Sequence, residues 1–140
     1  LIKAATVLAL LALPALALAY SSSPPNGRTN APGEGNCTAC HATYPLNSGS
    51  GSMTVSDLSG WAPGQTYDLE VVVADPGASR WGFEFTILDA AGNSVGALAT
   101  TDAQAQLSSS GARTYAKQTS AGTQNGTTGQ AAQYTAAAQP

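Results

Sequence analysis

Polar and apolar side chains alternate along much of the chain after residue 51, and this period of two is typical of half-buried β-strands. The alternation is strongest over 66–74 (TYDLEVVVA) and 81–88 (WGFEFTIL), which we predict as strands. In the second segment four large apolar residues share one face: Trp81, Phe83, Phe85 and Ile87. Residues 52–58 alternate in the same way, and weaker alternation predicts further strands over 95–101 and 113–119. No segment after residue 20 keeps the 3.6-residue period of a helix.

Turn-forming residues separate these strands, as they do in an antiparallel β-sandwich. The pattern therefore predicts an all-β fold. About five or six strands can be assigned, fewer than the roughly seven of a complete sandwich. We therefore expect a sandwich that is incomplete or that takes its missing edge from a partner.

Composition divides the chain into four segments. Residues 1–19 are apolar, and residues 20–51 form a Gly- and Pro-rich arm without a regular pattern. The predicted strands occupy 52–119, and residues 120–140 form a polar, low-complexity tail. Because the tail has few large apolar residues, we expect it to be disordered or to pair weakly.

The N-terminal segment 1–19 has the pattern of an export signal. Lys3 is its only charge, an apolar run follows, and it ends in Ala-Leu-Ala before Tyr20. The alternative is a retained membrane or assembly helix, since the run lies at the low edge of the roughly 17–25 residues that a spanning helix needs. Both interpretations predict a periplasmic, membrane-attached or extracellular protein.

Charged residues make up 9% of the chain, against about 25% in an average protein, and the net charge is −3. No basic cluster suggests a nucleic-acid partner, and no run of carboxylates suggests a Ca²⁺ or Mg²⁺ site. The chain has two cysteines and one histidine. This scarcity excludes most protein-only catalysis, so we do not expect an enzyme.

The two cysteines and the histidine stand together as Cys37-Thr38-Ala39-Cys40-His41. CxxCH is the signature of c-type haem attachment, in which the two thiols bond to the two vinyl groups of one haem. His41 would then be the proximal ligand of the iron. The motif predicts one covalent haem c per chain, and its attachment outside the cytoplasm agrees with the export segment.

Other interpretations of the cysteines are weaker. A disulfide between Cys37 and Cys40 would close a very short loop and constrain little chain. A thioredoxin-like pair normally lies at a helix start after a strand, and here Gly, Asn and Pro surround the motif. A zinc site would need a fourth ligand, and the chain has no other Cys or His.

The sixth ligand of such an iron stays open at this point. His41 is the only His, so two His ligands from one chain are impossible. Met53 is the only Met and a candidate axial ligand, although its apolar position in a predicted strand is more typical of a core residue. The alternatives are an open or water-bound position, Lys117, the N-terminal amine or a ligand from a neighbouring chain.

Several stretches, among them GRTNAPGEGNCTACH and SRWGFEF, resemble exported bacterial proteins with a choice-of-anchor type V domain, related to the Reeler β-sandwich. The resemblance covers roughly residues 20–125 and implies an immunoglobulin-like sandwich with a c-type haem near its N-terminal end. Cys37, Cys40 and His41 match the attachment motif, and Arg80 and Trp81 match a strand signature. The family usually has His where this chain has Gln118, so the resemblance implies that a natural second axial ligand is missing here.

Motif and resemblance together predict an exported monohaem c-type cytochrome for one-electron transfer. Its partners would be redox proteins, including other haem proteins. The alternative is a structural haem-bearing subunit of a membrane complex or extracellular filament, built from like or unlike chains. Haem catalysis ranks last because no distal acid–base pair is present. We expect Arg80, Trp81 and Arg113 at surface ends of strands rather than beside the haem.

Overall fold

The structure, a computed structural model, describes residue 20 and residues 22–56, 60, 62–75, 77–124 and 129–135. The predicted export segment, 1–19, lies outside the described residues. Within the described ranges, no helix is long and apolar enough to cross a membrane. These ranges contain seven strands and two short 3₁₀ helices, η1 (Cys37–Ala39) and η2 (Gly122–Gln124).

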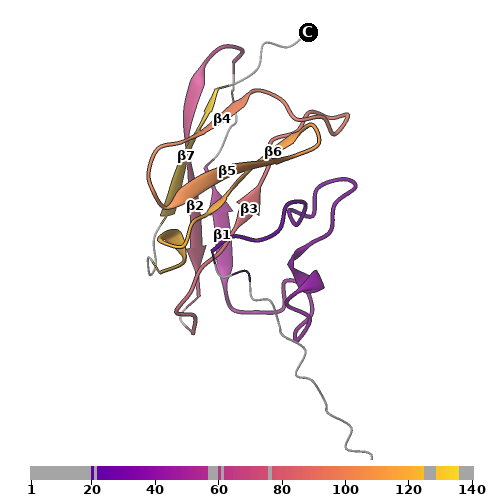
Figure 1. Cartoon of the computed structure of the whole chain (residues 1–140), viewed down its shortest axis with the longest axis vertical. Helices are drawn as coiled ribbons and strands as arrows, with labels where there is room; N and C mark the ends of the chain where they lie inside the picture. The colour runs from indigo at the N-terminus through magenta and orange to yellow at the C-terminus, as the bar shows by residue number, and fades with distance from the viewer. Residues whose placement is uncertain are drawn as a thin grey trace, which may run out of the picture.

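The strands form two antiparallel sheets (Figure 1). The four-stranded sheet has the order β1-β2-β7-β4 and consists of β1 (Ser52–Val55), β2 (Thr66–Ala74), β7 (Gly129–Thr135) and β4 (Ala97–Thr100). The three-stranded sheet has the order β3-β6-β5 and consists of β3 (Glu84–Phe85), β6 (Arg113–Gln118) and β5 (Ala105–Ser110). The prediction of an all-β, antiparallel architecture is confirmed.

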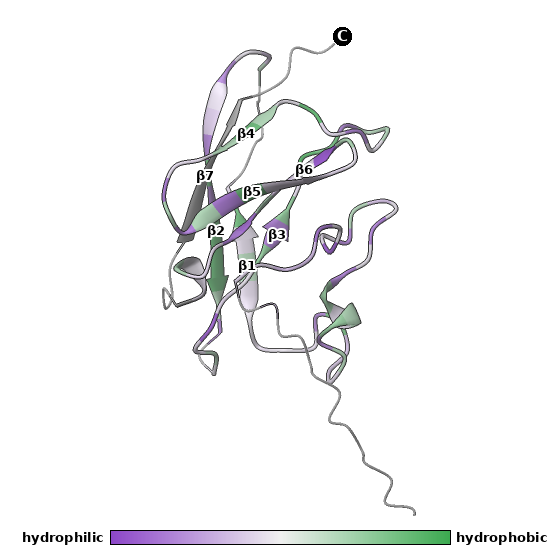
Figure 2. Ribbon diagram, viewed as in Figure 1, coloured by the Kyte–Doolittle hydropathy of each residue, from purple (hydrophilic) through white to green (hydrophobic). Residues whose placement is uncertain are grey.

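The two sheets share a hydrophobic core. Val71 of β2 clusters with residues of the other sheet and its flank, namely Phe83, Ala105 and Ala116. Leu69, two residues earlier on β2, packs against Phe85, Ile87 and Leu98. Figure 2 shows the corresponding hydrophobic colouring of β2. The period-two pattern therefore identified the core-facing sides of β2 and of the segment around β3.

The strand predicted over 81–88 is only partly regular. Its pairing with β6 is limited to the two residues of β3. The backbone N–H groups before β3 find partners outside a ladder: Trp81 N donates to Thr123 O (3.2 Å), and Phe83 N donates to the Gln118 side chain (2.8 Å). After β3, Leu88 forms a single bridge with Ser94. The core-facing side chains alternate as predicted, but hydrogen bonds to η2 and to the Gln118 side chain replace the ladder before β3.

Two strands carry no clear signal in the sequence. β5 (AQLSSS) pairs with β6 along six residue pairs, although Ala105 is its only buried residue. β7 lies inside the predicted tail, and its backbone pairs with both β2 and β4. With β5 and β7 the described residues have seven strands, more than the five or six expected. Backbone pairing defines both strands, and hydrophobic periodicity in a sequence carries no signal of backbone pairing.

Candidate functional site

The CxxCH motif forms one capped helical turn. Asn36 is its N-cap, and its Oδ1 accepts hydrogen bonds from Thr38 N (3.0 Å) and Thr38 Oγ1 (2.6 Å). Cys40 N and His41 N both donate to Cys37 O, at 3.2 and 2.9 Å. Side chains at i and i+3 eclipse in a 3₁₀ turn. Cys37 and Cys40 therefore lie on the same side of the turn, with His41 directly after it.

All three side chains of the motif are accessible. Cys37, Cys40 and His41 are exposed, and the two thiols are not joined in a disulfide. In the part of the chain that the structure describes, no group of three or more His, Cys, Asp or Glu residues is placed to hold a metal ion. Two exposed sulfur atoms on one side of a fixed turn, next to an exposed imidazole, are the donor set that covalent haem attachment requires.

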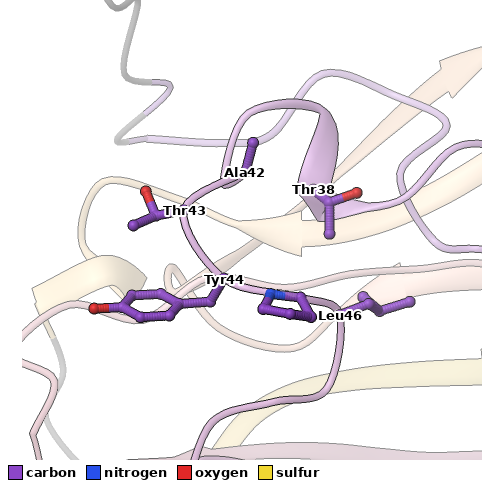
Figure 3. A pocket seen from close by; sticks show the side chains of 6 residues that line it. Thr38, Ala42, Thr43, Tyr44 and Leu46 are labelled. Carbon is purple, nitrogen blue, oxygen red and sulfur yellow. The ribbon is translucent and has the colours of Figure 1, made fainter.

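An open, shallow depression lies directly beside the motif (Figure 3). It is lined by Thr38, Ala42, Thr43, Tyr44, Pro45 and Leu46. Tyr44 is 74% exposed and Leu46 is 46% exposed, so large apolar side chains face solvent here. The depression is too open to enclose a group by itself, so a large cofactor here would need covalent attachment.

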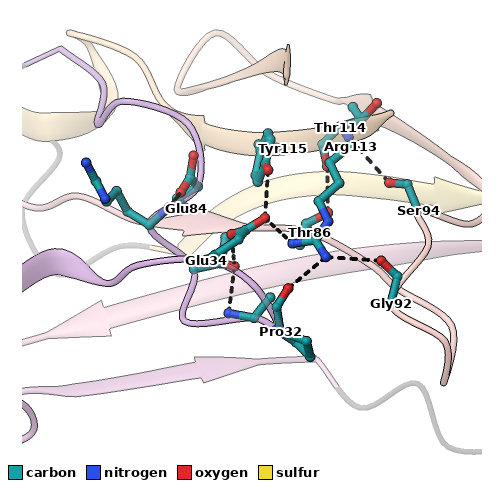
Figure 4. Close-up of polar contacts among 12 residues, drawn as sticks. Pro32, Glu34, Glu84, Thr86, Gly92, Ser94, Arg113, Thr114 and Tyr115 are labelled. Atoms are coloured by element: carbon teal, nitrogen blue, oxygen red, sulfur yellow. Dashed lines mark hydrogen bonds and ion pairs between the residues drawn. The ribbon is translucent and has the colours of Figure 1, made fainter. Parts of the chain in front are cut away.

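The arm that carries the motif is held on the three-stranded sheet by Glu34 (Figure 4). The Glu34 side chain is only 5% exposed and forms an ion pair with Arg113 of β6. It also accepts hydrogen bonds from Tyr115 Oη (2.7 Å) and Thr29 Oγ1 (2.6 Å). Arg113 further donates to Pro32 O (2.8 Å) and Gly92 O (3.1 Å). The arm is therefore fastened three residues before Cys37.

These bonds determine the ionisation of the groups around Glu34. Burial raises the pKa of Glu34, but the hydrogen bonds from Thr29, Tyr115 and Arg113 outweigh it and hold the pKa below its usual value. Burial and the bond to Glu34 raise the pKa of Tyr115 to about 12. Glu34 is therefore a carboxylate and Tyr115 a phenol donor at neutral pH.

A second cluster fastens the start of the arm. Glu84 of β3 and Lys117 of β6 are cross-strand neighbours, and both are buried. Lys117 Nζ donates to Pro24 O (2.9 Å) and Asn26 Oδ1 (2.6 Å), and Glu84 Oε2 accepts from Arg28 N (2.5 Å). Burial raises the pKa of Glu84 and lowers the pKa of Lys117. Lys117, one of the sixth-ligand alternatives, is thus engaged with the arm.

Met53 is not a core residue, and the expectation that its strand position favours core packing is wrong. Met53 and Val55 of β1 stand opposite Val73 and Val71 of β2, so they share the core-facing side of the four-stranded sheet. Met53 is nevertheless 57% exposed and Val55 is 43% exposed. β1 is an edge strand of its sheet. The exposure of Met53 and Val55 shows that the other sheet does not cover the core-facing side of β1. The Met53 thioether therefore makes no buried contact that would prevent it from binding elsewhere.

Gln118 faces the core, not the arm. It is buried and stands opposite Ala105, a member of the core cluster, so it lies on the core side of β6. Its Oε1 accepts the hydrogen bond from Phe83 N (2.8 Å). Lys117 and Tyr115, which bond to the arm, alternate with it on the opposite face. The position at which the family resemblance implies a second axial ligand is therefore directed away from the arm.

The three residues expected at surface strand ends have different environments. Arg80 is exposed, as expected. Trp81 is buried at 9% exposure, which contradicts the expectation, and its backbone N–H bonds to Thr123 O of η2. Arg113 is half-buried by its contact with Glu34. Sequence reasoning also missed Glu34, although a lone carboxylate in an arm of few charges was a signal for it.

In comparisons with known proteins, no family model, no curated protein and no solved structure matches the chain.

Proposed function

We propose that this protein is an exported monohaem c-type cytochrome, built on an immunoglobulin-like, Reeler-like sandwich, that transfers single electrons at or outside the cell membrane. The observation that carries the proposal is the Asn36-capped turn, which presents Cys37 and Cys40 unbonded and exposed beside His41. A covalently bound haem would supply a reversible one-electron couple.

The chain's own residues have distinct roles in this proposal. Cys37 and Cys40 bond the cofactor, and His41 binds its iron from the next position in the chain. Glu34 fixes the arm and hence the motif relative to the three-stranded sheet. Because the whole segment 39–55 is exposed, a partner can approach the site closely. Close approach without a deep pocket suits an electron carrier better than a catalyst.

The wild-type chain provides the test. When it is exported in cells with a haem c maturation system, the purified protein should give a c-type pyridine haemochrome spectrum. Its mass should increase by that of one haem, and it should titrate reversibly as a one-electron couple. An exported chain of unmodified mass, with no haem absorbance, would contradict the proposal.

The alternative, a haem-bearing subunit of a larger assembly, is favoured by the exposed apolar surface. Tyr44 and Leu46 beside the motif and Met53 and Val55 on edge strand β1 all face solvent. Exposed apolar patches and unpaired strand edges are common contact surfaces between chains. The oligomeric state of the haem-loaded protein distinguishes the two functions: a monomer across concentrations supports the carrier, and an ordered oligomer or fibre supports the subunit.

For the sixth position of the iron, we propose an open or water-bound site in the isolated chain. Gln118 is engaged in the core and Lys117 in the arm, which leaves the exposed Met53 as the rival within the described residues. The ferric protein should bind added imidazole or cyanide, and the ferrous protein should bind CO. Met53→Ala should leave the spectrum unchanged, as should Val55→Ala, its control on the same face of β1.

Ligation by Met53 would give a different result. The ferric spectrum would then show the weak long-wavelength charge-transfer band of a thioether–iron bond, and the reduction potential would be high, as in the Met/His class. Loss of that band in Met53→Ala, but not in Val55→Ala, would refute the open site. It would leave the proposal of haem attachment intact.

A further inference from the structure

The outer edge of β1 presents backbone groups that β2 does not use. Ser56, the residue after β1, donates its N–H to Glu70 O of β2 (3.0 Å), which continues the β1–β2 register by one pair. In an antiparallel strand the backbone groups of alternate residues point to opposite sides. The N–H and C=O groups of Met53 and Val55 therefore point away from β2. On that side of β1 no further strand lies in the described part of the chain.

The side chains at this edge are apolar and exposed. Met53 and Val55 have the two most exposed large apolar side chains among the strand residues whose burial the structure describes. β1 has no charged residue and no proline, and its register with β2 runs without a bulge. Charges, prolines and bulges are common means by which an edge strand avoids pairing with another chain. β1 has none of the three, so its edge can accept another strand.

The other edge strands of the described residues are better protected. The arm lies against β5, where Asn26 Nδ2 donates to Ser109 O (2.9 Å). β3 is only two residues long, and very short edge strands offer little to pair with. On β4, Leu98 packs against both core clusters, so the core-facing side of that strand is covered. These differences single out β1 as the edge for a contact between chains.

We propose that β1 pairs with β1 of a second copy of this chain, antiparallel and around a two-fold axis at Thr54. In this register Met53 stands opposite Val55 of the second copy, and each such pair exchanges both N–H···O bonds. Every outward N–H and C=O of these two residues then has a partner. A two-fold contact uses the same surface on both copies, so the match follows from the strand itself. The inference deepens the alternative function, a subunit of a larger assembly, and does not depend on haem attachment.

The side chains of β1 suit this pairing. Met53 of one copy and Val55 of the other lie side by side on the core-facing side, where cross-strand contacts stabilise a sheet. The chain has a net charge of −3, but the residues of β1 are uncharged, so no like charges stand opposite one another within the paired strands. The contact is short compared with the interface of a stable complex. We therefore expect a pair that forms at high protein concentration and dissociates on dilution.

Sedimentation equilibrium of the haem-loaded wild-type chain over a range of concentrations measures the pairing. It should show monomer and dimer without larger species, because a two-fold pair leaves no second β1 edge unpaired. A chain that stays monomeric up to about 1 mM overturns the inference. Growth into fibres overturns it as well, because an open-ended assembly needs two different surfaces of each chain.

Thr54→Lys tests the register. Thr54 is exposed on the outer face of the sheet and would stand opposite its own copy on the two-fold axis. Like charges directly opposite destabilise a strand pair, so the dissociation constant of the dimer should rise about five-fold at low salt. Thr54→Glu should weaken the dimer in the same way. An equimolar mixture of the two variants should restore association as a mixed dimer, because opposite charges then meet.

Thr100→Lys is the matched control for this charge. It makes the same substitution at an exposed position of β4, the edge strand at the other end of the sheet, and it should associate as the wild type does. Val55→Pro tests the backbone contribution: it removes an outward N–H and no hydrogen bond to β2, so it should weaken the dimer with little effect on the fold.

The outcomes separate this inference from the proposed function. An unchanged dissociation constant in Thr54→Lys, or a mixture of the two charged variants that does not associate, overturns the pairing. Loss of association in Thr100→Lys overturns it too, since the contact would then involve β4. A wild-type chain that takes up no haem overturns the proposed function, and its association still decides the pairing. A haem-loaded chain that stays monomeric overturns only the pairing.

Discussion

Replacement of both motif cysteines, Cys37→Ala together with Cys40→Ala, is expected to yield an exported chain without bound haem. Under the proposed function the thioether bonds would be the main attachment, because segment 39–55 is exposed and the neighbouring depression is shallow and open. A single coordinate bond from the exposed His41 has no buried pocket to support it. Haem absorbance that resists acid–acetone extraction should therefore disappear completely in the double variant.

The matched control for this experiment is Ala39→Ser. It changes an exposed residue between the two cysteines and keeps the CxxCH spacing. It should load haem as the wild type does, and each single cysteine variant should keep at most one thioether. The c-type assignment fails if the double variant retains full, non-extractable haem absorbance.

Glu34→Gln is expected to loosen the arm and with it the position of the motif. The substitution removes the charge that Arg113 and Tyr115 share, and it leaves the Arg113 cation without its carboxylate. Hydrogen bonds to a charged group contribute about 1.5–3 kcal/mol each, so the free energy of unfolding should fall by roughly that amount. Urea unfolding measures this loss, and hydrogen exchange of the amides in 27–36 should become faster.

The control is Glu70→Gln, the same chemical change at an exposed position of β2. It should alter the free energy of unfolding by less than about 0.5 kcal/mol, as is usual for surface substitutions. Equal effects of the two variants would show that Glu34 does not fasten the arm. Haem-loaded Glu34→Gln should also show a broader distribution of haem environments in its spectrum.

The pH dependence of stability should identify Glu34 independently. The pKa of Glu34 in the folded protein lies below its usual value of 4.5, so its contribution to stability is present above pH 4.5 and is lost as the pH falls through the folded pKa. Glu84 acts in the opposite direction. Because its pKa is raised in the folded protein, its contribution to stability is lost as the pH rises through that folded pKa. Glu34→Gln removes the contribution of Glu34, and it also removes the negative charge that adds to burial in raising the pKa of Glu84. The difference between wild type and variant should therefore shrink below pH 4.5, and a constant difference would refute the role assigned to Glu34.

Local features of the chain could be predicted from the sequence because they depend on short spacing. The alternation of TYDLEVVVA gave the bounds of β2 and its buried residues Leu69 and Val71, since a strand places every second side chain on one face. The same logic placed Phe83 and Phe85 in the core. CxxCH is likewise a local pattern, so its three candidate residues can be recognised without any tertiary contact.

The tertiary structure decided everything that depends on a distant partner. Glu34 and Arg113 are 79 residues apart, and no periodicity connects them. The exposure of Met53 and the burial of Gln118 depend on which strand of the opposite sheet covers them, not on the strands in which they lie. β5 and β7 exist because neighbouring backbones accept and donate their hydrogen bonds, and such pairing leaves little trace in side chains. By itself the sequence determined the strand periodicity and the CxxCH motif, whereas long-range polar contacts decided how the arm that carries the motif is held on the three-stranded sheet.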